Sequence, residues 1–154
     1  MLEAFLNENN FLLSAQIARG NPKKEGFNHI FNFVTLFDKE ELMSSIVGWV
    51  YVWVEIDKNS NLTPLYVGKA GVSQTLKKRF YQHERSFYSN VTGIPNAKKI
   101  DNILKNKNFE IAVFARHSPT TGSAFGINAI SLCELEEIAL IKKFRNEGYQ
   151  LWNK

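Results

Sequence analysis

The sequence has few of the residues that mark secreted, disordered or repetitive proteins. It contains a single cysteine, Cys133, so no disulfide can form within the chain. Nine glycines and four prolines are too few for a collagen-like or low-complexity chain. The first residues also lack the positive charge and long apolar run of a secretory signal. We therefore expect a globular protein in a reducing, cytoplasmic environment.

Long hydrophobic runs are absent as well. The longest apolar stretch, from Ile46 to Val54, ends at Glu55, whereas a membrane span needs about 20 apolar residues. We therefore expect no membrane partner. With 154 residues, the chain has the usual length of one domain with one core. Its formal net charge of +4 favours a polyanionic partner, although such an excess also occurs in proteins that never bind nucleic acids.

Several familiar site motifs are missing from the sequence. It has no Walker A loop, no dinucleotide-binding glycine pattern, no CxxC pair and no HExxH motif. His29 and His117 are far apart and lack the spacing of metal ligands. Cys133 has no partner histidine at a recognisable spacing, which indicates a structural thiol. A site must therefore be assembled from residues that are distant along the chain.

The hydropathy pattern predicts one α/β domain with an N-terminal extension. We expect the extension, residues 1–47, to contain a short helix within 2–18, an extended segment over 29–37 and a short helix from Asp38 to Ser45. The domain, residues 48–154, should contain strands at 48–56, 65–67 and 109–115, and helices at 73–85, 97–105 and 128–147. This order predicts a three-stranded mixed or antiparallel sheet flanked by helices.

The clearest strand, residues 48–56, alternates branched aliphatic side chains with aromatic ones, so each kind should take one face of the sheet. The next four residues have turn chemistry, which predicts a hairpin with the second strand. If Ile56 pairs with Asn61 across that turn, Tyr51 stands opposite Tyr66 on the aromatic face.

The final helix carries a carboxylate where an apolar side chain is expected. Glu137 lies near the middle of an apolar sector formed by Ile130, Cys133, Leu140, Ile141 and Phe144. Burial of an unpaired carboxylate costs several kcal/mol, so Glu137 should meet a cation, a metal or a pocket wall. Alternatively, it lies at the margin of the core and reaches water. Glu136 falls beside Lys143 on the helical wheel and Glu134 beside Arg145, which indicates solvated or paired surface charges.

Arg79 and His83 are four residues apart on a predicted helix, so both side chains project from one face. A guanidinium suits a phosphate, and an imidazole can pass a proton near neutral pH. The simpler interpretation is a solvated arginine beside a packed histidine. Tyr51 and Tyr66 are ordinary packing residues unless a neighbouring cation or histidine lowers the pKa of a phenol enough for it to act as a base.

Together these residues resemble the GIY-YIG nuclease family. Its first motif is similar to Trp49-Val50-Tyr51, and its second motif is similar to Tyr66-Val67-Gly68. The resemblance continues with Arg79 on one predicted helix and Glu137 on another, and it ends at Asn153. It covers the chain from about residue 48 onward, and the motifs occur in the order that the family requires.

One further residue and two departures refine the resemblance. His83 is similar to a histidine of the restriction-endonuclease branch, which lies close to the first tyrosine and favours a proton relay with Tyr51. Trp49 replaces the glycine of the first motif, which affects a backbone position and not a reactive group. The proline that usually precedes the final asparagine is missing, which weakens the assignment of Asn153.

The resemblance implies hydrolysis of DNA phosphodiester bonds with one Mg²⁺ or Mn²⁺ ion. It assigns metal binding to Glu137. It assigns to Arg79 the stabilisation of the negative charge that develops on the phosphoryl group. Tyr51 and His83 would orient and deprotonate the attacking water, and Tyr66 would support that water or the phosphate. Duplex DNA is the implied partner, in a restriction, toxin or mobile-element setting. A monomer and a homodimer are both compatible with the sequence.

Basic residues around these positions are candidates for contacts with DNA phosphates, although each one is also compatible with an ordinary surface charge. They are Lys69, Lys77, Lys78, Arg85, Lys98, Lys99, Lys105 and Arg116. One alternative function is a non-catalytic nucleic-acid-binding module on the same scaffold. Another is an interaction domain whose aromatic residues bind a protein partner. The intact set of candidate catalytic residues favours the enzyme.

Overall fold

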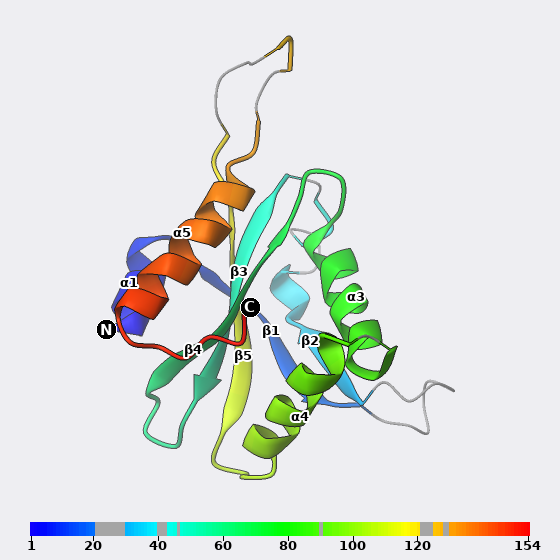
Figure 1. Cartoon of the computed structure of the whole chain (residues 1–154), viewed down its shortest axis with the longest axis vertical. Coiled ribbons are helices and arrows are strands. Elements are labelled where there is room, and N and C mark those ends of the chain that lie inside the picture. Colours follow the sequence, from blue (N-terminus) through cyan, green and yellow to red (C-terminus); the bar gives the residue numbers. More distant parts are fainter. Residues whose placement is uncertain (21–29, 40–42, 46, 90, 121–124, 128–129) are drawn as a thin grey trace.

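A five-stranded sheet forms the centre of the computed structural model, which describes residues 1–20, 30–39, 43–45, 47–89, 91–120, 125–127 and 130–154. In chain order the elements are α1 (Leu2–Glu8), β1 (Leu12–Arg19), β2 (Phe31–Thr35), the 3₁₀ turn η1 (Phe37–Lys39), β3 (Trp49–Ile56), β4 (Leu62–Ala70), α3 (Leu76–Ser89), α4 (Gly93–Leu104), β5 (Glu110–His117) and α5 (Cys133–Asn146). The strands run in the order β2-β1-β5-β3-β4, and each neighbouring pair is antiparallel (Figure 1).

The sheet therefore has five strands instead of the three expected, although the α/β class is correct. Both additional strands lie in the extension: β2 falls in the extended segment expected over 29–37, and β1 falls in the segment 2–18, where the pattern predicts only a short helix. Helix α1 ends at Glu8, and Asn10, with φ of 59°, turns the chain into β1. Ala15 and Ile17 then alternate into the core, and β1 pairs with β2 on one side and β5 on the other. An apolar pattern this short suits a helix or a strand, and the two adjacent strands decide the outcome.

The other expected elements are present, with shifted ends. The hairpin of β3 and β4 is confirmed, and helices lie at all three expected places. The last helix, α5, begins at Cys133 and not near residue 128, because Ser131 forms an isolated bridge with Thr120 and Leu132 is the N-cap. Ile130 therefore lies before the helix and not in its apolar sector, and residues 128–129 lie outside the described residues. The short helix expected from Asp38 begins with η1, and its continuation at 40–42 also lies outside them, as does His29.

The pairing of β3 with β4 differs from the expected register. Tyr51 stands opposite Gly68, and Tyr66 stands opposite Trp53. The register shifts between Trp53 and Val54, where Leu65 is an extra residue in β4 and Val54 pairs with Pro64. Proline has no N–H to donate to the ladder, so an irregularity beside it is expected. The expectation that Tyr51 faces Tyr66 directly is therefore wrong.

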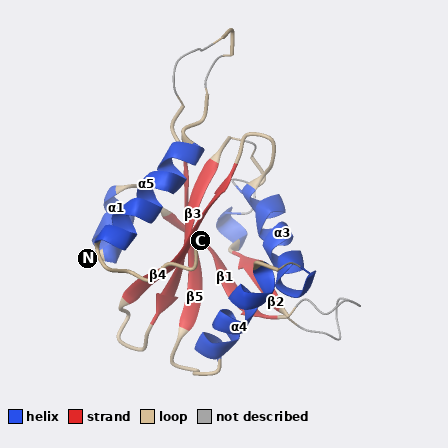
Figure 2. Ribbon diagram, in the orientation of Figure 1, coloured by secondary structure: helices blue, strands red, loops and turns tan. Residues whose placement is uncertain are grey.

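The two faces of β3 pack into two different layers. Val50, Val52 and Val54 contact α1 and α5 on one face of the sheet. Trp49, Tyr51 and Trp53 lie on the opposite face, where they pack against α3 and α4 (Figure 2). This division confirms the alternation read from the sequence. No helix in the described part of the chain is long and apolar enough to cross a membrane.

Strand β2, which comes from the first 47 residues, holds α3 against the sheet. The backbone N–H of Phe33 donates a hydrogen bond to Glu84 Oε1 on α3, at 2.8 Å. The Phe33 ring also stacks on Phe80, with centroids 4.7 Å apart, and contacts the ring of His83. The N-terminal segment thus fixes the helix that carries Arg79 and His83.

The absence of a side chain at Gly68 makes room for the phenol of Tyr51. A Cβ atom at Gly68 would lie 2.4 Å from both Cζ and the hydroxyl oxygen of Tyr51. Because Tyr51 and Gly68 are cross-strand partners, the Tyr51 ring lies across β4 at this point. The glycine of the second motif is therefore explained by this close approach.

We predict that Gly68→Ala lowers the free energy of unfolding by about 1–3 kcal/mol, because the new methyl group must displace a fully buried ring. Urea unfolding followed by tryptophan fluorescence measures this loss. Gly71→Ala is the matched control, since a Cβ at Gly71 meets nothing within 4 Å. Equal stabilities of the two variants would contradict the proposed contact.

Candidate active site

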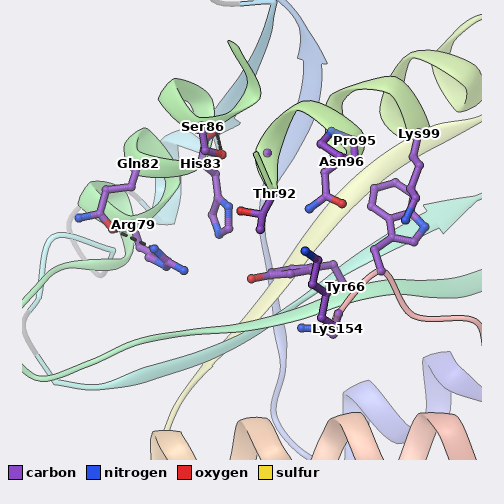
Figure 3. A pocket seen from close by; sticks show the side chains of 13 residues that line it. Tyr66, Arg79, Gln82, His83, Ser86, Thr92, Pro95, Asn96, Lys99 and Lys154 are labelled. Atoms are coloured by element: carbon purple, nitrogen blue, oxygen red, sulfur yellow. Dashed lines mark hydrogen bonds between the residues drawn. The ribbon is translucent and has the colours of Figure 1, made fainter. Parts of the chain in front are cut away.

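A pocket of about 590 Å³ opens between α3, α4, β4 and the C-terminal segment (Figure 3). Its lining residues are Tyr66, Arg79, Gln82, His83, Ser86, Thr92, Gly93, Pro95, Asn96, Lys99, Trp152, Asn153 and Lys154. Three of the five expected catalytic residues are among them. The other two, Tyr51 and Glu137, lie next to the pocket, as their interactions with its residues show.

A hydrogen bond between Tyr51 and His83 lies in the interior beside this pocket. The hydroxyl oxygen of Tyr51 is 2.6 Å from Nε2 of His83. Tyr51 is 0% exposed and His83 is 8% exposed. The rings of Trp53, Phe80 and Tyr66 surround the pair and hold both groups in place. The contact that the sequence led us to expect between these two residues is present.

Burial decides which partner of this hydrogen bond carries the proton. Burial, together with a smaller contribution from the nearby Arg79 cation, lowers the pKa of His83 to about 3. Burial also raises the pKa of Tyr51 above its usual value, an effect that Tyr66 reinforces and Arg79 opposes. At neutral pH the phenol therefore keeps its proton and donates it to a neutral imidazole. Tyr51 is therefore not ionised in this site, and its hydroxyl group donates its hydrogen bond to His83.

Arg79 lies between the phenols and the solvent. Its guanidinium interacts electrostatically with Tyr51, Tyr66 and Glu137. One of its terminal nitrogens donates to Gln82 Oε1 at 3.0 Å, whereas its buried Nε has no hydrogen-bond partner among the described residues. Figure 3 shows Arg79, His83 and Tyr66 directed toward the same end of the pocket. Buried donors in proteins normally have a hydrogen-bond partner, and an anion bound here would be a partner for the Arg79 guanidinium.

Glu137 reaches the site from α5, on the other side of the sheet. The residue is half-buried, and burial raises the pKa of its carboxyl group, while the cations Lys69 and Arg79 oppose that change. Its charge also acts on both Tyr51 and Tyr66. The carboxylate in the apolar sector of the helical wheel is therefore close enough to Arg79 and the two phenols to affect their pKa values.

Most of the expected DNA-contacting bases do not line the pocket. Lys99 does, whereas Lys77, Lys78, Arg85 and Lys98 are exposed elsewhere on α3 and α4. Lys105 forms an ion pair with Asp101. Lys69 forms an ion pair with Glu134, and Arg116 forms one with Glu136. Glu134 and Glu136 are thus paired charges, as one of the two alternatives from the sequence had it. Their partners come from β4 and β5 and not from the bases beside them on the wheel, because a wheel compares only residues of one helix.

Asn153 has a structural contact that the sequence did not indicate. Its side-chain amide donates to the backbone oxygen of Val67 at 2.7 Å and accepts from the Val67 N–H at 2.9 Å. The neighbouring Trp152 N–H donates to the oxygen of Leu65 at 2.7 Å. Because β4 is an edge strand, these bonds cover backbone groups that no strand pairs with. The C-terminal segment thus becomes one wall of the pocket.

Sequence reasoning missed several residues of the pocket. Gln82 lies three positions after Arg79 on α3, and Asn96 three before Lys99 on α4, so helical spacing could have indicated both. Trp152 and Lys154 belong to a segment without secondary structure, and no periodic pattern places such residues.

Comparison of this chain with known proteins finds a similarity in structure but none in sequence. No protein-family model matches the chain, and no curated protein sequence matches it. The fold is similar to a solved structure of bacteriophage T4 EndoII that carries a glutamate-to-alanine substitution. The TM-score is 0.59 at 17% identity, and the match covers 93% of this chain and 94% of the other. The similarity therefore extends over almost the whole chain and takes in most of the first 47 residues.

We predict that His83 makes the stability of the protein dependent on pH. The folded state keeps His83 neutral, so between about pH 6.5 and pH 3 only the unfolded chain takes up this proton. Stability should therefore fall with decreasing pH by roughly 1 kcal/mol per pH unit from this residue. Urea unfolding at pH 7, 6 and 5 should show a shallower dependence for His83→Gln than for the wild type. Parallel pH dependences would contradict the neutral, buried state.

We predict that Asn153→Ala lowers the free energy of unfolding by about 1–3 kcal/mol, since it removes two hydrogen bonds from the backbone of Val67. Thermal unfolding measures the loss. Gln150→Ala, at an exposed position of the same segment, is the control and should change the melting temperature little. A wild-type melting temperature for Asn153→Ala would show that the segment does not need this contact.

Proposed function

We propose that this protein is a metal-dependent endonuclease that hydrolyses phosphodiester bonds of DNA. The observation that carries the proposal is the convergence of two phenols, an imidazole, a guanidinium and a carboxylate, from four different elements, at one edge of the sheet. The same residues are those that resemble the GIY-YIG nuclease motifs. The solved structure with a similar fold bears the name of an endonuclease, which adds independent support.

The residues present fit a single divalent cation. Glu137 is a half-buried carboxylate without an ion pair to any described residue, so its oxygens are available as ligands. The described residues contain no cluster of three or more side chains suited to hold a metal. Mg²⁺ accepts such a site, because it commonly uses one or two carboxylates together with waters and substrate phosphates. When bound, the ion would supply charge stabilisation to the phosphoryl group.

Arg79 and Tyr66 are placed to bind the phosphate. The guanidinium would donate hydrogen bonds to non-bridging oxygens and stabilise the additional negative charge of the transition state. The Tyr66 hydroxyl points to the same end of the pocket and would donate a further hydrogen bond (Figure 3). Loss of one such donor typically costs two to three orders of magnitude in turnover.

Tyr51 and His83 provide a path for the proton of the attacking water. As the water oxygen bonds to phosphorus, its proton passes to the Tyr51 oxygen, and the phenolic proton passes to His83 Nε2. The bond from phosphorus to the leaving sugar oxygen breaks, and that oxygen takes a proton from solvent. Burial keeps His83 neutral, so Nε2 has a free lone pair at neutral pH, and the negative charge of a bound phosphate would raise the pKa of His83 toward the range in which an imidazole accepts a proton readily.

We predict that the purified protein converts supercoiled plasmid to relaxed or linear DNA with Mg²⁺ and leaves it intact in EDTA. Glu137→Gln and Arg79→Ala should each reduce the cleavage rate at least about 100-fold, because each removes a charge from the site. Gel electrophoresis over time measures the rate. A single site in a monomer would produce relaxed circles first, whereas a paired site would produce linear DNA directly.

Two exposed charges outside the pocket provide matched controls. Glu134→Gln removes a carboxylate from α5 that is exposed and paired with Lys69, and Lys107→Ala removes an exposed cation that follows α4. Both variants should cleave within a few-fold of the wild-type rate. Full activity of Glu137→Gln would contradict the proposal, as would equal losses in the two α5 variants.

A further inference from the structure

The part of the pocket formed by α4 and the C-terminal segment is more than a continuation of the candidate active site. It contributes Asn96, Lys99, Trp152 and Lys154, whereas Arg79 and His83 come from α3 across the pocket. Three lining side chains are cationic, those of Arg79, Lys99 and Lys154, and no described lining side chain is a carboxylate. A pocket whose charged side chains are all positive favours an anionic ligand.

The position of the Lys99 ammonium is defined by an aromatic ring. Its Nζ lies 5.5 Å from the centre of the Trp152 ring. Trp152 is fixed in turn by its backbone hydrogen bond to Leu65 and by an edge contact with Trp53, at a centroid distance of 6.3 Å. A lysine held over a ring loses less conformational freedom when it binds a ligand than one that extends into water.

Several cations outside the pocket have carboxylate partners. Arg19 and Lys105 both pair with Asp101, and Lys143 pairs with Glu147. Lys69 and Arg116 have glutamate partners as well. By contrast, neither Lys99 nor Lys154 forms an ion pair with any residue that the structure describes. The two lysines in the pocket are therefore available for a phosphate.

The size of the pocket exceeds the needs of one phosphate. Its volume of about 590 Å³ falls within the range of roughly 300–1,000 Å³ in which proteins enclose whole small-molecule ligands. The side-chain amides of Gln82 and Asn96 line it from α3 and α4 and offer both donors and acceptors. A nucleotide has a matching composition, since it combines a phosphate with a polar sugar and base.

We propose that Lys99 and Lys154 form a second phosphate subsite, which holds the phosphate next to the scissile one on the same DNA strand. The nucleotide between the two phosphates then lies in the pocket, against Gln82 and Asn96. Trp152 is a positioning residue that holds Lys99 at the subsite. This inference rests on the proposed function for the location of the scissile phosphate, whereas the binding of a phosphate by Lys99 does not depend on cleavage.

We predict that Lys99→Met weakens binding to a fluorescein-labelled DNA duplex about tenfold, measured by fluorescence anisotropy in EDTA so that no turnover occurs. The salt dependence of log affinity should become shallower by about one unit, as expected for the loss of one phosphate contact. Lys107→Met is the control, because Lys107 is an exposed lysine just after α4, does not line the pocket and is not among the candidate DNA contacts. Equal losses in the two variants, or no binding by the wild type, would overturn the subsite.

A second experiment identifies the phosphate itself. Duplexes with one uncharged methylphosphonate at successive positions should bind wild-type protein more weakly at one particular position, and Lys99→Met should be insensitive at that position. An equal sensitivity of both proteins at every position would overturn the inference. If the coupling appears but no variant or wild type cleaves DNA, the subsite stands and the endonuclease proposal fails. If cleavage occurs without the coupling, the endonuclease stands and the subsite fails.

Discussion

The hydrogen bond between Tyr51 and His83 is the interaction on which the rest of the site depends. It joins the central strand β3 to α3 inside a cluster of aromatic rings. Gly68 leaves the space through which the phenol crosses β4, and β2 holds α3 at the correct distance through Phe33. The scaffold is therefore arranged around one buried polar contact, whose two groups are neutral because water is excluded from them.

The site also divides its charges between the two faces of the sheet. The phenols, the imidazole and the guanidinium lie on the side of α3, and the carboxylate comes from α5 on the other side. The groups meet at the edge strand β4, whose outer backbone is covered by the C-terminal segment at Leu65 and Val67. An edge strand suits this purpose because side chains from both layers can reach past it without crossing the sheet.

The sequence predicted the parts of the fold that have strong local patterns. Alternation from Trp49 to Val54 was sufficient to assign the two faces of β3, and an isolated carboxylate in an apolar sector identified Glu137. Strand β1 was not predicted, because its few apolar residues are compatible with the periodicity of a helix and with that of a strand. Only the pairing of β1 with β2 and β5 decides between the two. The ion pairs of Glu134 and Glu136 and the wall formed by Trp152 and Asn153 are contacts between distant segments, which periodicity does not reveal.

The irregular pairing beside Pro64 has a consequence for the tolerance of this hairpin to insertions and deletions. Leu65 and Tyr66 are consecutive residues, yet both pack into the layer of Tyr51, because two residues of β4 stand opposite Trp53 alone. A deletion of Leu65 would therefore leave Tyr66 opposite Trp53 and Gly68 opposite Tyr51, and the ladder would become regular. A deletion at Val67, by contrast, would move either Tyr66 or Gly68 out of its pairing and onto the other face. Natural variation in length should therefore concentrate at Leu65 and at the exposed tip and avoid the residues from Tyr66 to Gly68.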